Sequence, residues 1–226
     1  EEVDYELLER VLGRTRPTAE LKRRAAAQTA QARTVREKAG ALYRFVLAQV
    51  PTRSGLSSAH QILVERAGQR NILLAALLEA AGCEVRFAFW RPDDSRVGRG
   101  GMSPAESRLP RAADFPHVLL CVLTEEAQPL WLDAESGYLP FGALPDLASG
   151  ASAFVVAPGG GRFLTLPQTS PPEMSLVTWR TLSVRAEGTV WCRSFQRAFG
   201  ARGASRREAF LELDHASRET AVESSL

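Results

Sequence analysis

Two residues in the middle of the chain have the types and the setting needed for acid–base chemistry. His117 directly precedes the apolar run 118–123, and Asp133 ends the shorter apolar run 130–132. Each run is typical of a short β-strand, and antiparallel pairing of the two strands would bring His117 and Asp133 to the same end of a sheet. A histidine held by a carboxylate can move a proton or bind a polar group. The sequence therefore places a candidate site at that end of the sheet.

The element that must position this site is predicted from the stretch 65–82. Within residues 72–81 only Glu79 is not apolar, which is typical of a buried central helix. Gly82 is suited to end that helix in the left-handed conformation. Residues 84–90 then alternate with period two, so a strand is expected directly after the helix.

This helix-then-strand pair resembles the core of the transglutaminase-like superfamily, in which the helix begins Gly-Asp-Cys and the cysteine is the nucleophile. Counting back from residues 75–82 places these three family residues on Glu65, Arg66 and Ala67. The resemblance is to bacterial members whose papain-like core lies between β-rich domains. It implies an α+β fold in which N-terminal helices pack on an antiparallel sheet, with an alanine at the nucleophile position.

A second motif carries the same resemblance. Family members place the general-base histidine at the start of one strand and its orienting aspartate at the end of the next, and His117 and Asp133 match those places. Residues 138–145 resemble the Tyr-x-Pro-Phe-Gly-x-Leu-Pro turn that often follows the aspartate. The resemblance covers residues from about 20 to about 190, and it implies that His117 and Asp133 are the vestigial dyad of a site without its cysteine.

Two departures from the family pattern bear on activity. A one-residue shift of the alignment offers Arg66 or Gly68, so no thiol or hydroxyl reaches the nucleophile position. The segment 51–58 is poorer in aromatic residues than the family's active-site wall. Without the sulfur no acyl-enzyme can form at this position. We therefore expect a pseudoenzyme that needs no cofactor and uses the old cleft to bind a peptide or protein partner.

Two alternatives stay open. The chain could be an active transglutaminase-like or protease-like acyl transferase in which the nucleophilic cysteine has been changed to Ala67, or a hydrolase in which His117 serves another nucleophile. Against a single change, Glu65 and Arg66 also replace the family's glycine and acidic residue. The chain could also be a structural spacer of a larger envelope protein, and a cleft filled by side chains near His117 would favour that reading.

The N-terminal part is predicted to be helical. Residues 3–12 show a short amphipathic pattern, and residues 19–32 are rich in alanine. Thr34 and Glu37 have the spacing of a capping box, which predicts a helix start ahead of the apolar stripe that runs to Val50. In the resembled family, a helix of this kind packs beneath the nucleophile helix.

The other two histidines are not expected to act with His117. Ser58 is suited to cap a short helix that carries His60 at the surface, and His215 lies far along the chain. A metal site needs at least three ligands, and none of the histidine or cysteine spacings provides them. No metal site is therefore expected.

Composition narrows the remaining function classes. The chain has 226 residues, a net charge of +2, 45% hydrophobic and 24% charged residues, all ordinary for a globular protein. The charge is too small to indicate a nucleic-acid partner, and no apolar run is long enough to insert into a membrane. The three cysteines are widely spaced and odd in number, which does not indicate a disulfide framework, and Cys83 and Cys121 are expected to act as small hydrophobes in or beside core strands. Because family relatives are often secreted or attached to the envelope, the resemblance implies a periplasmic or cell-envelope location.

The chain is expected to divide near residue 167. Residues 153–166 predict a hairpin with glycines at its turn, and residues 167–172 have the composition of a linker, with three prolines. We expect a transglutaminase-like core with N-terminal helices at 1–166, and at 167–226 the start of a β-rich accessory domain with one C-terminal helix over 204–214. Because the chain begins without methionine, we expect it to be a piece of a longer protein.

Overall fold

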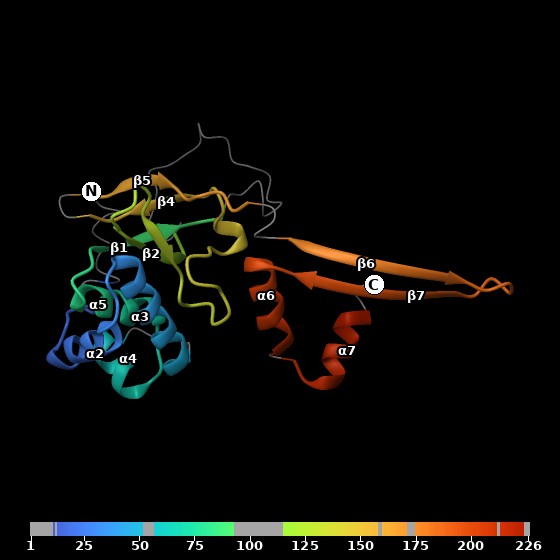
Figure 1. Cartoon of the computed structure of the whole chain (residues 1–226), viewed down its shortest axis with the longest axis horizontal. Helices are drawn as coiled ribbons and strands as arrows, with labels where there is room; N and C mark the ends of the chain where they lie inside the picture. The colour runs from blue at the N-terminus through green and yellow to red at the C-terminus, as the bar shows by residue number, and fades with distance from the viewer. Residues whose placement is uncertain are drawn as a thin grey trace.

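The computed structural model of the chain describes residues 11, 13–51, 57–92, 115–157, 160–170, 175–211 and 213–223. The helix expected at residues 3–12 and most of the loop after residue 91 lie outside these described residues. Figure 1 shows a layer of helices on one side of a twisted sheet, and a long hairpin that projects away from both.

Four helices form the helical layer, and their starts follow local capping chemistry. They are α2 (Ala19–Thr29), α3 (Val35–Gln49), α4 (Ala59–Glu65) and α5 (Arg70–Ala80). The predicted capping box is confirmed, because the Thr34 hydroxyl accepts from the Glu37 N–H while the Glu37 carboxylate accepts from the Thr34 N–H. The Ser58 side chain likewise accepts from the Gln61 N–H and starts α4.

The central helix is shorter than its sequence pattern predicts. Helix α5 is buried almost throughout, as expected, and Gly82 follows it with φ +77°. Its predicted start near residue 65 is wrong, because Glu65 ends α4, Arg66 takes a left-handed conformation, and Arg70 is the first helical residue. An irregular segment over residues 66–69 joins the two helices. In it Gly68 lies so near Ile62 that an added Cβ would be 2.6 Å from Ile62 Cγ1.

The sheet is antiparallel throughout, as predicted, with the strand order β3-β2-β1-β4-β5. Its strands are β1 (Val85–Trp90), β2 (His117–Val122), β3 (Leu130–Leu132), β4 (Ser152–Val155) and β5 (Arg162–Thr165). The predicted hairpin over 153–166 is confirmed by the pairing of β4 with β5. The short 3-10 helix η3 (Asp146–Ala148) lies between β3 and β4 along the chain.

Alternation along the strands gives the sheet two apolar faces. On one face Phe89, Leu120 and Leu132 join the cluster formed with α2 to α5, so this face is the main core. On the opposite face, here called the outer face, Trp90, Cys121 and Trp131 join a second cluster with residues 144–151 of the connection after β3. Both faces of the sheet are therefore covered over much of their area.

The C-terminal part forms a separate two-stranded sheet. Strands β6 (Leu176–Val184) and β7 (Val190–Ala198) pair over their full length, and α6 (Gly200–Leu211) and α7 (His215–Glu223) follow. The expectation of one helix at residues 204–214 is wrong in detail, because the first helix starts at Gly200 and a second one begins at His215. The side chain of Asp214 explains the second start, since its carboxylate accepts from the Ser217 N–H at 2.8 Å.

The cysteines and the helix lengths bear on two further predictions. Cys83 and Cys121 are buried free thiols, as expected for small core residues, and Cys192 is an exposed free thiol. Among the described helices, none combines the length and the apolar character that a membrane crossing requires.

Candidate functional site

The nucleophile position of the resembled family does not open a helix in this chain. Ala67 is half-buried in the turn between α4 and α5, three residues before the first helical residue, Arg70. A group at the N-terminus of a helix gains from the dipole only within the first turn. Ala67 therefore lies outside the setting that would lower the pKa of a thiol there.

His117 and Asp133 do lie at the same end of the sheet. His117 is the first residue of β2, Asp133 directly follows β3, and these strands pair antiparallel with Leu120 opposite Leu132. Their side chains face different neighbours. The exposed His117 ring stacks on Trp90, with 4.7 Å between ring centroids, and Trp90 belongs to the outer-face cluster.

One oxygen of the Asp133 carboxylate is engaged at the start of α5. Its Oδ1 accepts from Asn71 Nδ2 at 3.3 Å and from the Glu135 N–H at 3.0 Å. Among the described residues, no hydrogen bond joins Asp133 to the His117 ring. The carboxylate that would orient the imidazole is thus held by an asparagine of the central helix.

Both polar groups of the Asn71 side chain are engaged in hydrogen bonds. Its Nδ2 also donates to the Val118 carbonyl at 2.9 Å, and its Oδ1 accepts from the Ala134 N–H at 2.9 Å. One buried side chain therefore ties the start of α5 to β2 and to the end of β3. Such a fully bonded buried polar group fixes the register of its neighbours.

The N-terminus of α5 is capped by a residue from a distant part of the chain. Gln69 provides no side-chain cap, and Glu135 Oε1 accepts from the Asn71 N–H at 2.9 Å. The buried Arg70 guanidinium donates to the carbonyls of Val50, Ala134 and Glu135. A carboxylate therefore already sits at the partly positive helix end, where an anionic reaction intermediate would otherwise be stabilised.

Tyr43 of α3 joins the same cluster through its hydroxyl group. Its hydroxyl lies 2.9 Å from the Asp133 carbonyl oxygen and 2.8 Å from that of Leu139, and only 2% of the residue is exposed. Burial raises the pKa of Tyr43, and the nearby Asp133 charge adds to the rise. The hydroxyl is therefore a neutral hydrogen-bond donor.

Burial governs the ionisation of the acidic groups as well. It raises the pKa of Asp133 and of Glu135, although hydrogen bonds to each carboxylate lower the pKa and so oppose the rise. Desolvation lowers the pKa of His117, and the Asp133 charge only partly offsets this. A charged imidazolium paired with a charged aspartate is consequently disfavoured at this end of the sheet.

Three residues of this cluster were not singled out from the sequence. Arg70 and Asn71 are the polar pair that directly precedes the apolar stretch of α5, and Glu135 stands two residues after Asp133. The pair of polar residues at the start of a buried helix was a usable signal, because buried polar groups must find partners. The identity of those partners depends on long-range contacts.

The described residues offer no metal centre in this region or elsewhere, since no three His, Cys, Asp or Glu side chains among them gather as ligands would. The chemistry of the cluster around Asp133 is that of its own side chains. This cluster holds the carboxylates of Asp133 and Glu135, the Arg70 guanidinium, the Asn71 amide and the Tyr43 phenol, and it presents at the surface the His117 imidazole, whose pKa is lowered by burial.

Comparison with known proteins gives the fold of this chain and no closer relationship. No family model matches the sequence, and no curated protein matches it. Among solved structures, a "putative protease" from Parabacteroides distasonis is similar with a TM-score of 0.54 at 13% identity, over 81% of this chain and 37% of that one. A "putative cysteine protease" from Cytophaga hutchinsonii is similar with a TM-score of 0.41 at 15% identity, over 84% of this chain and 57% of that one.

This chain thus spans little more than a third of the first of these proteins and under two thirds of the second. The first similarity, together with the helical layer on an antiparallel sheet, establishes an α+β papain-like fold, as the sequence predicted. A fold of this kind does not by itself define an activity.

Proposed function

We propose that this chain is a catalytically inactive transglutaminase-like domain that acts as a binding or scaffolding module. The observation that carries the proposal is the hydrogen bond from Asn71 to the Asp133 carboxylate. In a catalytically active histidine–aspartate dyad, the carboxylate holds the imidazole in the tautomer that can accept a proton from the nucleophile. Here it is engaged by an amide, and the nucleophile position is Ala67.

The position of Glu135 supports the same proposal. A substrate carbonyl that becomes an oxyanion needs free N–H donors at the site. In this chain the Asn71 N–H already donates to the Glu135 carboxylate, and Gln69 and Ala67 precede the helix in an irregular turn. An internal carboxylate in this place stabilises the fold and competes with a reacting group.

The binding role is proposed for the surface around His117. Its exposed imidazole, held flat against the buried Trp90, offers a ring face and a polar edge at the surface, which suits a peptide or protein partner. We further propose that the core extends over residues 1–166, that residues 167–226 begin a β-rich accessory part, and that the protein is a bacterial one located at the cell envelope.

Alkylation of an introduced thiol tests the proposal. In a Cys192→Ser background, which removes the exposed cysteine, the variant Ala67→Cys is treated with iodoacetamide across a pH series. We expect its rate to rise with an ordinary thiol pKa of about 8.5 and to be unchanged when His117→Ala is added. Ala32→Cys, at another half-buried loop alanine, is the matched control.

Fast alkylation below neutral pH that is lost with His117→Ala would overturn the proposal. That result would mean that the histidine activates a thiol at residue 67, and it would favour the alternative of an active enzyme seen as a cysteine-to-alanine variant. A thiol at residue 67 that behaves like the one at residue 32 supports a rebuilt, inactive site.

A further inference from the structure

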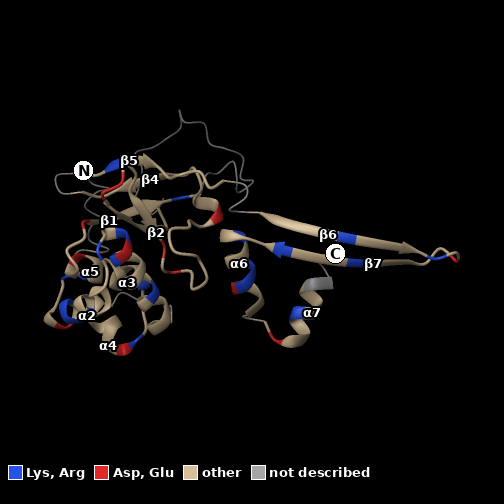
Figure 2. Ribbon diagram, viewed as in Figure 1, with Lys and Arg blue, Asp and Glu red and all other residues tan. Residues whose placement is uncertain are grey.

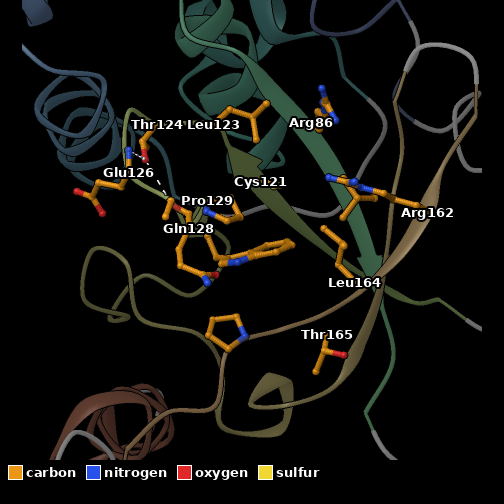
Figure 3. Close-up of a pocket in the computed structure, with 14 residues that line it drawn as sticks. Arg86, Cys121, Leu123, Thr124, Glu126, Gln128, Pro129, Arg162, Leu164 and Thr165 are labelled. Atoms are coloured by element: carbon orange, nitrogen blue, oxygen red, sulfur yellow. Dashed lines mark hydrogen bonds between the residues drawn. The ribbon is translucent and has the colours of Figure 1, made fainter.

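A second candidate site lies on the outer face of the sheet, on the side away from α2 to α5. A cavity of about 350 Å³ opens there between the β2–β3 connection and strand β5. Figure 3 shows Cys121 at its floor, Gln128 and Pro129 on one side, and Arg86 and Arg162 together on the other side. This volume is within the range of small-molecule pockets.

The strand register explains how these residues come together. Cys121 is paired with Arg86 of β1 and with Trp131 of β3, so the three side chains form a row across the sheet. Val155 of β4 is paired with Arg162 of β5, which places a second row beside the first. Paired residues share a face, and Cys121, Trp131 and Val155 all belong to the outer-face cluster.

The lining combines an apolar floor with two cations. Trp131, Val155 and Leu164 provide carbon surface, and Arg86 and Arg162 are the two cationic residues of the lining. Burial raises the pKa of the Cys121 thiol to about 11, and both arginines oppose this rise, so both charges act on the floor of the cavity.

The two arginines differ in how far they are neutralised. Arg86 Nη2 lies 2.5 Å from Glu84 Oε1, in an ion pair whose glutamate is largely exposed. The Arg162 guanidinium forms no ion pair or hydrogen bond with a side chain or carbonyl of the described residues, although its backbone pairs with β4. The third charged lining residue, Glu126, faces the cation of Arg36 at 3.6 Å. One guanidinium at the cavity is therefore available to an incoming anion.

We propose that this cavity binds a small carboxylate that carries an apolar body, with Arg162 and Arg86 at the carboxylate and Trp131 and Leu164 against the body. The planar fork of an arginine matches a carboxylate in two parallel hydrogen bonds. The nearby Glu84 and Glu126 disfavour a more highly charged anion such as phosphate. The carboxylate can belong to a free acid or to the C-terminus of a short peptide.

Binding of phenylacetate to the whole chain tests this inference, with the Trp131 indole N–H resonance as the reporter and Trp131→Phe used to assign it. We expect saturable shifts with millimolar affinity, roughly tenfold weaker affinity in Arg162→Gln, and unchanged affinity in Arg207→Gln, at an exposed arginine of α6. Phenylacetamide, which has the same shape without the charge, is expected to bind much more weakly.

Two further arms complete the test. N-acetyl-Gly-Phe with a free C-terminus is compared with its C-terminal amide, and preference for the free form over phenylacetate identifies a peptide end as the better source of the carboxylate. Inorganic phosphate is expected to shift the resonance less than phenylacetate does. Each variant is checked for an unchanged melting temperature, so that loss of binding is not loss of folding.

Three results would overturn the inference. They are the absence of any shift at Trp131 with either carboxylate, equal binding of phenylacetate and phenylacetamide, and equal loss of affinity in Arg162→Gln and Arg207→Gln. None of these results depends on residue 67, so this site and the proposed inactive site fail or stand separately.

Discussion

The five-stranded sheet and the β6–β7 hairpin differ in how far their strands are buried. The strands of the sheet are covered by other parts of the chain, and those of the hairpin are largely exposed. In the main core, which the helices share with one face of the sheet, Leu73, Leu74, Leu77 and Leu78 of α5 are 0% exposed. On the hairpin, Trp191 and Phe195 are each 60% exposed. Figure 2 shows charged segments interspersed over the helical layer, whereas most of the hairpin ribbon carries no charge.

The difference shows where the stability of the described chain resides. A two-stranded sheet is marginally stable in water by itself, and α6 packs against this one, for example through Arg206 Nη1 and Gln196 Oε1 at 2.6 Å. The core sheet has helices on one face and the 144–151 cluster on the other. Mutations should therefore act strongly in the core and weakly on the hairpin.

Truncation of a core leucine is expected to have the largest effect. Leu77→Ala should lower the free energy of unfolding by about 2–5 kcal/mol, because a cavity would form in the centre of α5. Leu182→Ala on the hairpin, where the side chain is 64% exposed, should change it by less than about 0.5 kcal/mol. Urea unfolding of both variants makes the comparison, and equal losses would show that the hairpin is buried in solution.

Two glycines with positive φ, one in the core and one in the hairpin turn, extend the comparison of the two regions to substitutions of the backbone. Gly68→Ala combines a φ of +144° with a Cβ 2.6 Å from Ile62 Cγ1, so we expect a loss of about 1–3 kcal/mol. Gly188→Ala in the hairpin turn has a φ of +88° but nothing within 4 Å, and should cost about 1 kcal/mol from backbone strain. The midpoints of thermal unfolding measure both, and a larger loss at Gly188 would contradict the packing argument.

The pH dependence of stability should have opposite signs in the two regions. Burial raises the pKa of Asp133 above its ordinary value of 3.8, so the folded state favours the protonated form. Its contribution to stability is complete below pH 3.8 and is lost as the pH rises through the folded-state pKa. Asp133→Asn keeps an oxygen acceptor for Asn71 without titrating, and its stability relative to the unmodified chain should increase as the pH rises above 3.8.

Asp214, the cap of α7, provides the matched control. Hydrogen bonds from Ser217 lower its pKa below 3.8, so its contribution is present above that pH and is lost as the pH falls through the lowered folded-state pKa. Asp214→Asn should therefore lose stability relative to the unmodified chain as the pH rises. Urea unfolding at a series of pH values measures both variants, and curves of the same sign would refute the assignment.

Local rules accounted for much of the fold. The capping boxes at Thr34 and Ser58, the buried character of α5, the alternation in β1 and the apolar run of β2 are properties of short segments, and each was predictable from the sequence. They also sufficed to place His117 and Asp133 at one end of the sheet. The residue types at those places and the alanine at residue 67 suggested a site without its nucleophile.

Tertiary structure decided what those residues contact. The apolar pattern of α5 continues too evenly to locate its first turn, and Arg70 begins the helix because Gly68 packs on Ile62 and Glu135 caps the Asn71 N–H. The outer-face cavity depends on strand order, since Arg86 and Arg162 are 76 positions apart in the sequence. Contacts between groups so distant along the chain are set by pairing register and burial, which local patterns do not encode.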